Sequence, residues 1–268
     1  MIIKTLTVDQ TKNRYNIRVL DRAFHILALL SDGKPRTLQE LSAEIGLSTS
    51  TTFRQLATLV NYRYAQRDEQ TNQYTLGLAC LELARSYHEA NDLRRVAIPE
   101  LEKLRNETKE TVHLAILDQM EIVYIEKLQG LHAIGLMGSR VGGRSPAYCT
   151  GVGKVMLAYE SPQVIQDYFL RRKLQRYTAN TIVSIAALVS ELALIHNQGY
   201  ALDHEEHELE VCCVATPIVD IKRDVIAALS ISGPADRLEP IEANQDLIEK
   251  AKQTANNISR KMGYISLE

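Results

Sequence analysis

The chain has 268 residues, of which 45% are hydrophobic and 24% charged, and a net charge of −2 at pH 7. This length favours two domains, and the composition is that of a soluble globular protein. No apolar run approaches the roughly 18 residues of a membrane span, the start lacks the features of a signal peptide, and four scattered cysteines exclude a secreted disulfide framework. A reduced, cytoplasmic protein is expected.

Charge is unevenly distributed along the chain. Residues 1–80 carry ten basic and seven acidic side chains, a net charge of +3, whereas the remaining residues carry −5. A basic first third on an acidic body suggests a nucleic-acid module joined to a domain of another purpose.

The first eighty residues predict three short helices. The first contains apolar residues at helical spacing, Leu20, Phe24, Leu27 and Leu30. The second begins after an N-cap at Thr37 and ends at Gly46. The third is capped by Ser48, and its inward positions are expected to be Phe53, Leu56 and Leu59 or Val60. Two short helices joined by a glycine-containing turn match the helix-turn-helix pattern.

The third helix begins with a polar turn that suits DNA recognition. Arg54 and Gln55, one turn further on, are long enough to reach guanine and adenine in a major groove. Residues 64–76 predict a hairpin with a polar tip, which is the wing of a winged helix. The predicted DNA-binding residues are Thr37, Ser48, Thr49, Ser50, Thr51, Arg54, Gln55, Arg67 and Asn72. The alternative is a packing module that mediates protein contacts only.

The rest of the chain predicts a mixed α/β (α+β) domain. Two helical stretches, broken near Asn91–Asp92, precede alternating strands over 111–118 and 121–128. A third strand is expected over 133–140 and a loop over 141–146. Helices then follow from about Thr150, Ser161 and Ile185, strands over 199–203, 211–219 and 224–232, and a final helix from about Pro240 to Met262. Five or six antiparallel strands with helices around them indicate a domain of GAF-like size.

Several segments carry a resemblance to one family, among them "RAFHILALL", "TLQELSAEIGLSTSTTFRQLATL", "ETVHLAILD", "SRVGGRSPAYCTGVGKVMLAY" and "QGYALDHEE". Over essentially its whole length the chain resembles the isocitrate lyase regulator (IclR) family of bacterial transcription factors. "IVYIEK" and "SRVGGRSP" also resemble the subgroup that controls sugar-acid catabolism, which includes regulators responding to 2-keto-3-deoxygluconate. The resemblance implies a winged helix-turn-helix domain over 1–77, a linker helix over 78–92, and a GAF-like effector-binding and oligomerisation domain over 93–268, assembled as a homodimer or a dimer of dimers.

The resemblance also places an effector pocket, at Gly151, Val152, Asp203, Cys213, Ser230 and Ser232. These residue types suit a small hydroxylated acid, because backbone N–H groups and serine hydroxyls donate to a carboxylate while an aspartate accepts from ligand hydroxyls. His113, on a neighbouring predicted strand, is expected to reach the same cavity, although a buried core histidine is the more ordinary interpretation.

The stretch "DHEEHELEVCC", residues 203–213, raises the question of a metal site. His204 and His207 are three apart in a predicted loop, and the adjacent Cys212 and Cys213 point to opposite faces of a strand, so zinc is less favoured than an organic acid. No metal or cofactor is expected. The glutamates of this stretch are predicted to form a solvated edge.

The chain departs from the family at three positions. Thr49 stands where a basic residue is frequent, and Arg63 and Glu210 stand where glycine is usual. The leading hypothesis is a ligand-responsive repressor that binds a palindromic double-stranded operator. The alternatives are an enzyme that acts on a small acid through Cys213 and His113, and a redox sensor that uses Cys212 and Cys213.

Overall fold

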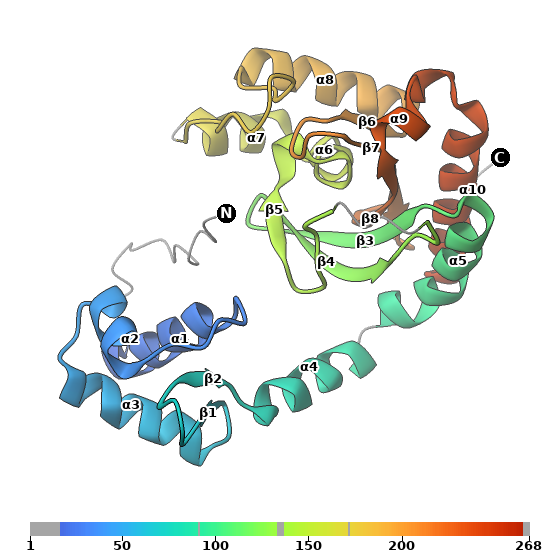
Figure 1. Ribbon diagram of the computed structural model, residues 1–268. Coiled ribbons are helices and arrows are strands. Elements are labelled where there is room, and N and C mark those ends of the chain that lie inside the picture. Colours follow the sequence, from blue (N-terminus) through green and yellow to red (C-terminus); the bar gives the residue numbers. More distant parts are fainter. Residues whose placement is uncertain (1–16, 91, 133–136, 171, 265–268) are drawn as a thin grey trace. The chain divides into compact units, whose positions relative to one another are not determined.

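The computed structural model of the chain describes residues 17–90, 92–132, 137–170 and 172–264 (Figure 1). Two compact units divide between Ala90 and Asn91, and each has its own hydrophobic core. Among the described helices, none is long and apolar enough to cross a lipid bilayer.

The first unit is a three-helix bundle followed by a two-stranded hairpin and a further helix. Its elements are α1 (Arg18–Leu30), α2 (Leu38–Ile45), α3 (Thr49–Asn61), β1 (Ala65–Arg67), β2 (Tyr74–Leu76) and α4 (Leu78–Ala90). The strands β1 and β2 pair antiparallel, and Tyr74 also bridges to Arg36 just before α2, which ties the hairpin to the helices. This arrangement confirms the predicted winged helix. The predicted linker helix corresponds mostly to α4, which lies within the first unit.

Side-chain caps define the two helices of the helix-turn-helix. The Thr37 hydroxyl accepts from the Glu40 backbone N–H at 3.3 Å, and the Glu40 carboxylate accepts from the Thr37 N–H at 2.7 Å, which completes a capping box. Gly46 ends α2 with φ of 71°, a left-handed conformation that glycine adopts without strain. Ser48 then caps α3 by accepting from the Thr51 N–H. All three predicted boundaries are therefore confirmed.

The face of α3 that is buried differs from the prediction. Its buried residues are Thr52, Gln55, Leu56 and Leu59, a stripe at i, i+3, i+4 and i+7. Phe53 lies beside this stripe and is 47% exposed, so the prediction that it points inward is wrong. On α1 the buried residues are Ile26 and Leu30, while Phe24 of the expected apolar repeat is exposed.

The second unit is built on a six-stranded antiparallel sheet. In spatial order the strands are β5 (Arg144–Pro146), β4 (Glu121–Leu128), β3 (Thr111–Asp118), β8 (Val225–Pro234), β7 (Val211–Val219) and β6 (Ala201–His204). The prediction of a strand over 133–140 is wrong for residues 137–140, which form no strand. Residues 133–136 lie outside the described part of the chain. The edge strand lies instead at Arg144–Pro146, within the predicted loop, because it pairs with Glu121–Val123 of β4.

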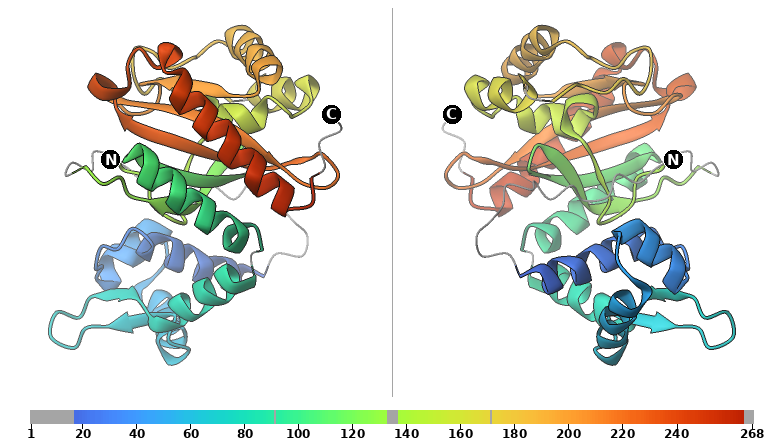
Figure 2. Two further views of the ribbon diagram at one scale, coloured as in Figure 1. Left: turned by 90° about the vertical axis from the view of Figure 1, so that its right-hand side faces the viewer. Right: turned by 90° about the vertical axis from the view of Figure 1, so that its left-hand side faces the viewer.

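Helices cover both faces of this sheet (Figure 2). One face packs against α5 (Asp92–Thr108) and α10 (Gln245–Lys261), with α9 (Ala235–Leu238) and the 3-10 helix η2 (Ile241–Ala243) nearby. The other face packs against the 3-10 helix η1 (Ala147–Cys149), α6 (Gly151–Leu157), α7 (Pro162–Leu170) and α8 (Ile185–Gln198). The final helix begins at Gln245, later than predicted, with Asn244 as its N-cap.

The capping box predicts a measurable contribution to stability. Thr37→Ala removes the acceptor for the Glu40 N–H and should destabilise the first unit by about 0.5–2 kcal/mol. The control is Thr58→Ala, an exposed threonine of α3 whose hydroxyl bonds to the Arg54 carbonyl within its own helix. Hydrogen exchange of the α2 amides during urea unfolding of the full chain measures the loss of stability in each variant. Equal exchange rates in Thr37→Ala and Thr58→Ala would contradict the predicted difference in stability.

Candidate functional site

Polar residues converge on the face of the sheet that packs against α6. Asp203 is paired with Cys213 across β6 and β7, Cys213 with Ser232 across β7 and β8, and Ser230 with His113 across β8 and β3. Because side chains alternate between the two faces of a strand, this register places all five on one face. Their neighbours in the core of that face are Ala201, Ala215 and Ala228.

The start of α6 lies directly against this cluster. A Cβ on Gly151 would lie 2.7 Å from the Cys213 sulfur and 3.6 Å from the Asp203 Cβ, so only glycine permits this approach. Val152 is buried in the core on the same face. The structure thus brings together the residues predicted for effector binding.

His113 is the centre of a buried hydrogen-bond network. Its Nδ1 lies 3.3 Å from the hydroxyls of both Ser230 and Ser232, which are 3.2 Å from each other. Its Nε2 lies 2.8 Å from the Ser139 hydroxyl. Burial, with the nearby charge of Lys127, lowers the pKa of His113 to about 3, so the imidazole is neutral near pH 7.

A buried ammonium group lies beside this network. Lys154 of α6 is 1% exposed and forms ion pairs with Glu206 and, at 3.0 Å, with Glu191 of α8. Burial opposes its charge, but Glu206, Asp203 and Glu191 together raise the pKa of Lys154. Burial raises the pKa of Asp203 and Glu206, against the effect of Lys154. The Glu206 N–H in turn donates to Asp203 at 2.9 Å, so Lys154 and Asp203 belong to one network.

Lys154 and Glu206 were not among the predicted site residues. The prediction that the glutamates of residues 203–213 form a solvated edge is wrong for Glu206, which is buried and has one carboxylate oxygen without a hydrogen-bond partner among the described residues. A lysine within the otherwise apolar run "GVGKVML" was the available signal, because an amphipathic surface helix would not place it there.

A short loop covers the network. Lys127 donates to the carbonyls of Met137 and Ser139, at 3.2 and 2.7 Å. The Gly138 N–H donates to the Glu208 carboxylate at 3.2 Å. Ser139 is thereby held over His113, a contact that sequence reasoning did not identify.

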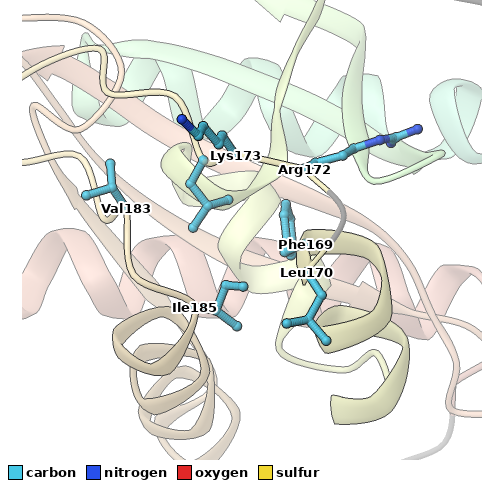
Figure 3. Close-up of a pocket in the computed structure, with 7 residues that line it drawn as sticks. Phe169, Leu170, Arg172, Lys173, Val183 and Ile185 are labelled. Atoms are coloured by element: carbon cyan, nitrogen blue, oxygen red, sulfur yellow. The ribbon is translucent and has the colours of Figure 1, made fainter.

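A separate cleft of about 450 Å³ opens between α7 and the start of α8 (Figure 3). Its lining combines apolar and basic side chains, Phe169, Leu170, Arg172, Lys173, Leu174, Val183 and Ile185. None of these belongs to the His113 network. The network differs from this cleft in that its buried polar groups converge from β3, β6, β7, β8 and α6.

The first unit presents a polar surface at the start of α3. Thr49, Ser50 and Arg54 are exposed, and Ser48 and Thr51 share a hydroxyl hydrogen bond of 2.9 Å. On the wing, the Arg67 guanidinium donates to the Asn72 side chain. The prediction that Gln55 contacts DNA is wrong. Gln55 is only 7% exposed and belongs to the buried stripe of α3, so it cannot reach a base edge.

Comparisons with known proteins agree with this architecture. The profile of the IclR helix-turn-helix domain matches residues 19–69, and that of the bacterial transcriptional regulator IclR C-terminal domain matches residues 85–260. The transcriptional regulator KdgR of Escherichia coli is 34% identical over 256 residues, covering 96% of this chain and 97% of its own.

Solved structures share the fold. The IclR protein of Thermotoga maritima superposes with a TM-score of 0.75 at 31% identity, covering 93% of this chain and 100% of that one. An IclR homologue from Microbacterium hydrocarbonoxydans, complexed with 4-hydroxybenzoate, gives a TM-score of 0.81 at 27% identity, covering 91% and 99%.

The depressed pKa of His113 predicts a pH dependence of folding. Between its ordinary value of 6.5 and about 3, the unfolded chain binds a proton that the folded chain excludes. His113 therefore makes stability fall as the pH drops below 6.5, by up to about 1.4 kcal/mol per pH unit. Urea unfolding at pH 7 and pH 5, compared with His113→Asn, isolates this effect, since every other side chain is the same in both proteins. The same loss of stability in the variant, or a protonated His113 ring in NMR spectra at pH 5, would contradict the assignment.

Proposed function

The chain belongs to the IclR family of bacterial transcriptional regulators, and we propose that it represses a catabolic operon until a small organic or sugar acid binds its second unit. The observation that carries this proposal is the convergence of buried polar groups around His113, in a chain whose first unit is a winged helix. These groups bond to one another in the structure, and a hydroxylated acid supplies donors and acceptors that can replace those hydrogen bonds.

On the DNA side, α3 is the proposed recognition helix. Arg54 and the hydroxyls of Thr49 and Ser50 are exposed on it, and a helix of this kind reads base edges in the major groove. Thr37, Ser48 and Thr51 are proposed to contact phosphates at the starts of α2 and α3, and Arg67 and Asn72 to contact the backbone or minor groove from the wing. The proposed partner is a double-stranded operator, and the proposed location is the cytoplasm.

On the effector side, the proposed ligand is an acid that also carries hydroxyl groups. Ser230, Ser232 and the backbone at Gly151 and Val152 would donate to its carboxylate, and Asp203 would accept from a hydroxyl. The bound 4-hydroxybenzoate of the Microbacterium protein is also a hydroxylated acid, which supports this class. The similarity to KdgR across nearly the whole chain supports the sugar-acid subgroup.

The proposed assembly is a homodimer or a dimer of dimers. The family resemblance implies it, and exposed apolar side chains on the first unit, including Leu20 and Phe24 of α1 and Leu81 of α4, are suited to burial between copies.

Catalysis and redox sensing have less support. The Cys213 thiol contacts Asp203 rather than His113, and burial raises the pKa of Cys213 well above its usual value, which disfavours a nucleophilic thiolate. Cys212 and Cys213 lie on opposite faces of β7, and burial raises the pKa of Cys212 as well. We therefore propose that the protein has no enzymatic activity.

Arg54→Ala should weaken operator binding by about 1–3 kcal/mol and relax base preference at one position, because it removes a side chain proposed to read a base. Arg95→Ala is the matched control, since it removes the same charge from an exposed position on α5 of the other unit. Fluorescence anisotropy with operator and single-base variants measures both effects. Equal affinities of the two variants would mean that α3 is not the recognition helix.

Asp203→Asn should leave operator binding intact but remove the response to the effector. The amide keeps an oxygen that can accept from the Glu206 N–H, so the local fold survives while the negative charge is lost. Operator release is measured with a panel of aldonic, 2-keto-3-deoxy and hydroxybenzoic acids. Glu205→Gln, a more exposed carboxylate two residues away, should respond as the parent does. A normal response in Asp203→Asn would move the effector site elsewhere.

A further inference from the structure

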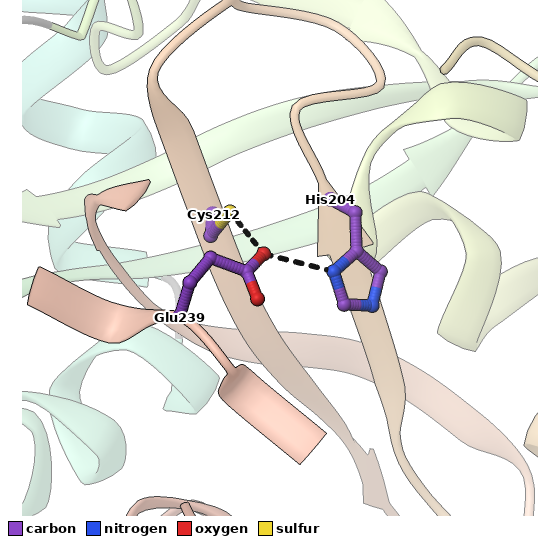
Figure 4. A group of neighbouring side chains, drawn as sticks. All are labelled: His204, Cys212 and Glu239. Carbon is purple, nitrogen blue, oxygen red and sulfur yellow. Dashed lines mark hydrogen bonds and ion pairs between the residues drawn. The ribbon is translucent and has the colours of Figure 1, made fainter. Parts of the chain in front are cut away.

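We propose that His204, Cys212 and Glu239 form a binding site for a transition-metal ion of the zinc class. The site lies on the opposite face of β6 and β7 from the proposed effector pocket, and it is independent of the effector assignment. Figure 4 shows the three side chains directed toward one another from β6, β7 and the segment after α9. Their candidate ligand atoms all lie within 4.8 Å of one another.

The pairing of β6 with β7 creates this arrangement. His204 and Cys212 are direct cross-strand partners, so their side chains share one face. Asp203 and Cys213 are the next pair in the same ladder and therefore share the other face. His204 and His207, the histidine pair considered from the sequence, do not form one ligand set. The His207 ring packs instead against the Tyr177 ring, with 4.7 Å between the ring centroids. The ligand set thus combines His204 with Cys212, not Cys213, and with Glu239, which is 35 residues further along the chain.

The distances approach those between the ligands of a small tetrahedral ion. Zinc bonds of about 2.0–2.3 Å place ligand atoms about 3.3–3.8 Å apart. In the structure the Glu239 Oε1 lies 3.0 Å from the His204 Nδ1 and 3.0 Å from the Cys212 Sγ. Small rotations of the partly exposed His204 and Glu239 side chains are therefore enough to admit an ion, while Cys212 is buried in the strand.

Neighbouring groups already orient two of the ligands. The second oxygen of Glu239 accepts from the Ile241 N–H at 3.1 Å, which turns Oε1 toward His204 and Cys212. On the far side of the imidazole, His204 Nε2 lies 3.1 Å from the Glu242 carboxylate. A carboxylate behind a metal-bound histidine fixes its orientation and strengthens its donor nitrogen, so Glu242 is a positioning residue.

The donor set selects the class of metal. A thiolate and an imidazole favour zinc and related ions, whereas magnesium and calcium prefer oxygen ligands. Binding would release the thiol proton of Cys212, and the charges of Zn²⁺, one thiolate and one carboxylate would then cancel. Three protein ligands leave a fourth position for water. The ion would link β6 and β7 to the segment between α9 and α10.

Zinc and cobalt titrations of the reduced, chelator-treated full chain test the site. The expected result is one ion per chain by native mass spectrometry and, with Co²⁺, the near-ultraviolet charge-transfer band of a thiolate ligand. Zinc should also raise the unfolding temperature, since it binds only the folded arrangement. An absence of stoichiometric zinc, or a cobalt complex without the thiolate band, would overturn the proposal.

Variants locate the ion. Cys212→Ser should abolish the thiolate band, and the more exposed Glu239→Gln should weaken zinc binding by more than tenfold without disturbing the core. Glu242→Gln should weaken it by about 10–100-fold while the thiolate band remains. Circular dichroism of each metal-free variant verifies folding.

Cys213→Ser and His207→Gln are the matched controls, since each changes the same residue type beside the site but not in it. Both should bind zinc as the parent does. Loss of zinc in Cys213→Ser with retention in Cys212→Ser would place the ion in the effector pocket and contradict this site. Equal binding by every variant would identify an adventitious surface ion and contradict it as well.

Discussion

The buried charge of Lys154 constrains how the elements of the second unit are arranged. An ammonium removed from water is tolerated only when carboxylates surround it, and here Glu206 and Glu191 do so from two different segments. The ion pairs hold α6 against the turn after β6 and against α8. Because the Glu206 N–H also bonds to Asp203, the position of α6 and that of the proposed ligand-binding carboxylate are linked.

The alternation of side chains along β6 and β7 divides this region into two chemically different sites. Asp203 and Cys213 face α6, whereas His204 and Cys212 face the segment after α9. An ion on the second face would not touch the effector, but it would stiffen the strands that carry Asp203 and Cys213. Any effect of the ion on the effector would be matched by an equal effect of the effector on the ion, because such coupling is reciprocal.

Sequence patterns predicted the local features well. The caps at Thr37 and Ser48 depend on residues within three positions, and the strands over 111–118 and 121–128 were predicted from their alternation. The effector residues came from resemblance to a family. The structure also explains why glycine is usual at two positions where the chain departs from that family: Arg63 and Glu210 adopt φ of 61° and 62°, the left-handed conformation that glycine adopts without strain.

The features that sequence patterns missed depend on distant contacts. Lys154 and Glu206 are 52 residues apart, and His204 and Glu239 are 35 apart, so no local periodicity relates them. The rotation of α3 was missed because hydrophobicity alone favoured Phe53, whereas the packed stripe required Gln55. The strand Arg144–Pro146 is too short to show alternation.

The hydrogen bonds of the His113 network have an energetic consequence for ligand binding. A carboxylate that bonds to Ser230 and Ser232 must replace the contacts of these hydroxyls with His113 Nδ1, each at 3.3 Å. A hydrogen bond contributes a net stability of about 0.5–1.5 kcal/mol, so breaking both contacts costs about 1–3 kcal/mol. A ligand with micromolar affinity supplies about 8 kcal/mol of net binding free energy after that cost. Ser230 and Ser232 can therefore bond to His113 in the free protein and still bind a small acid.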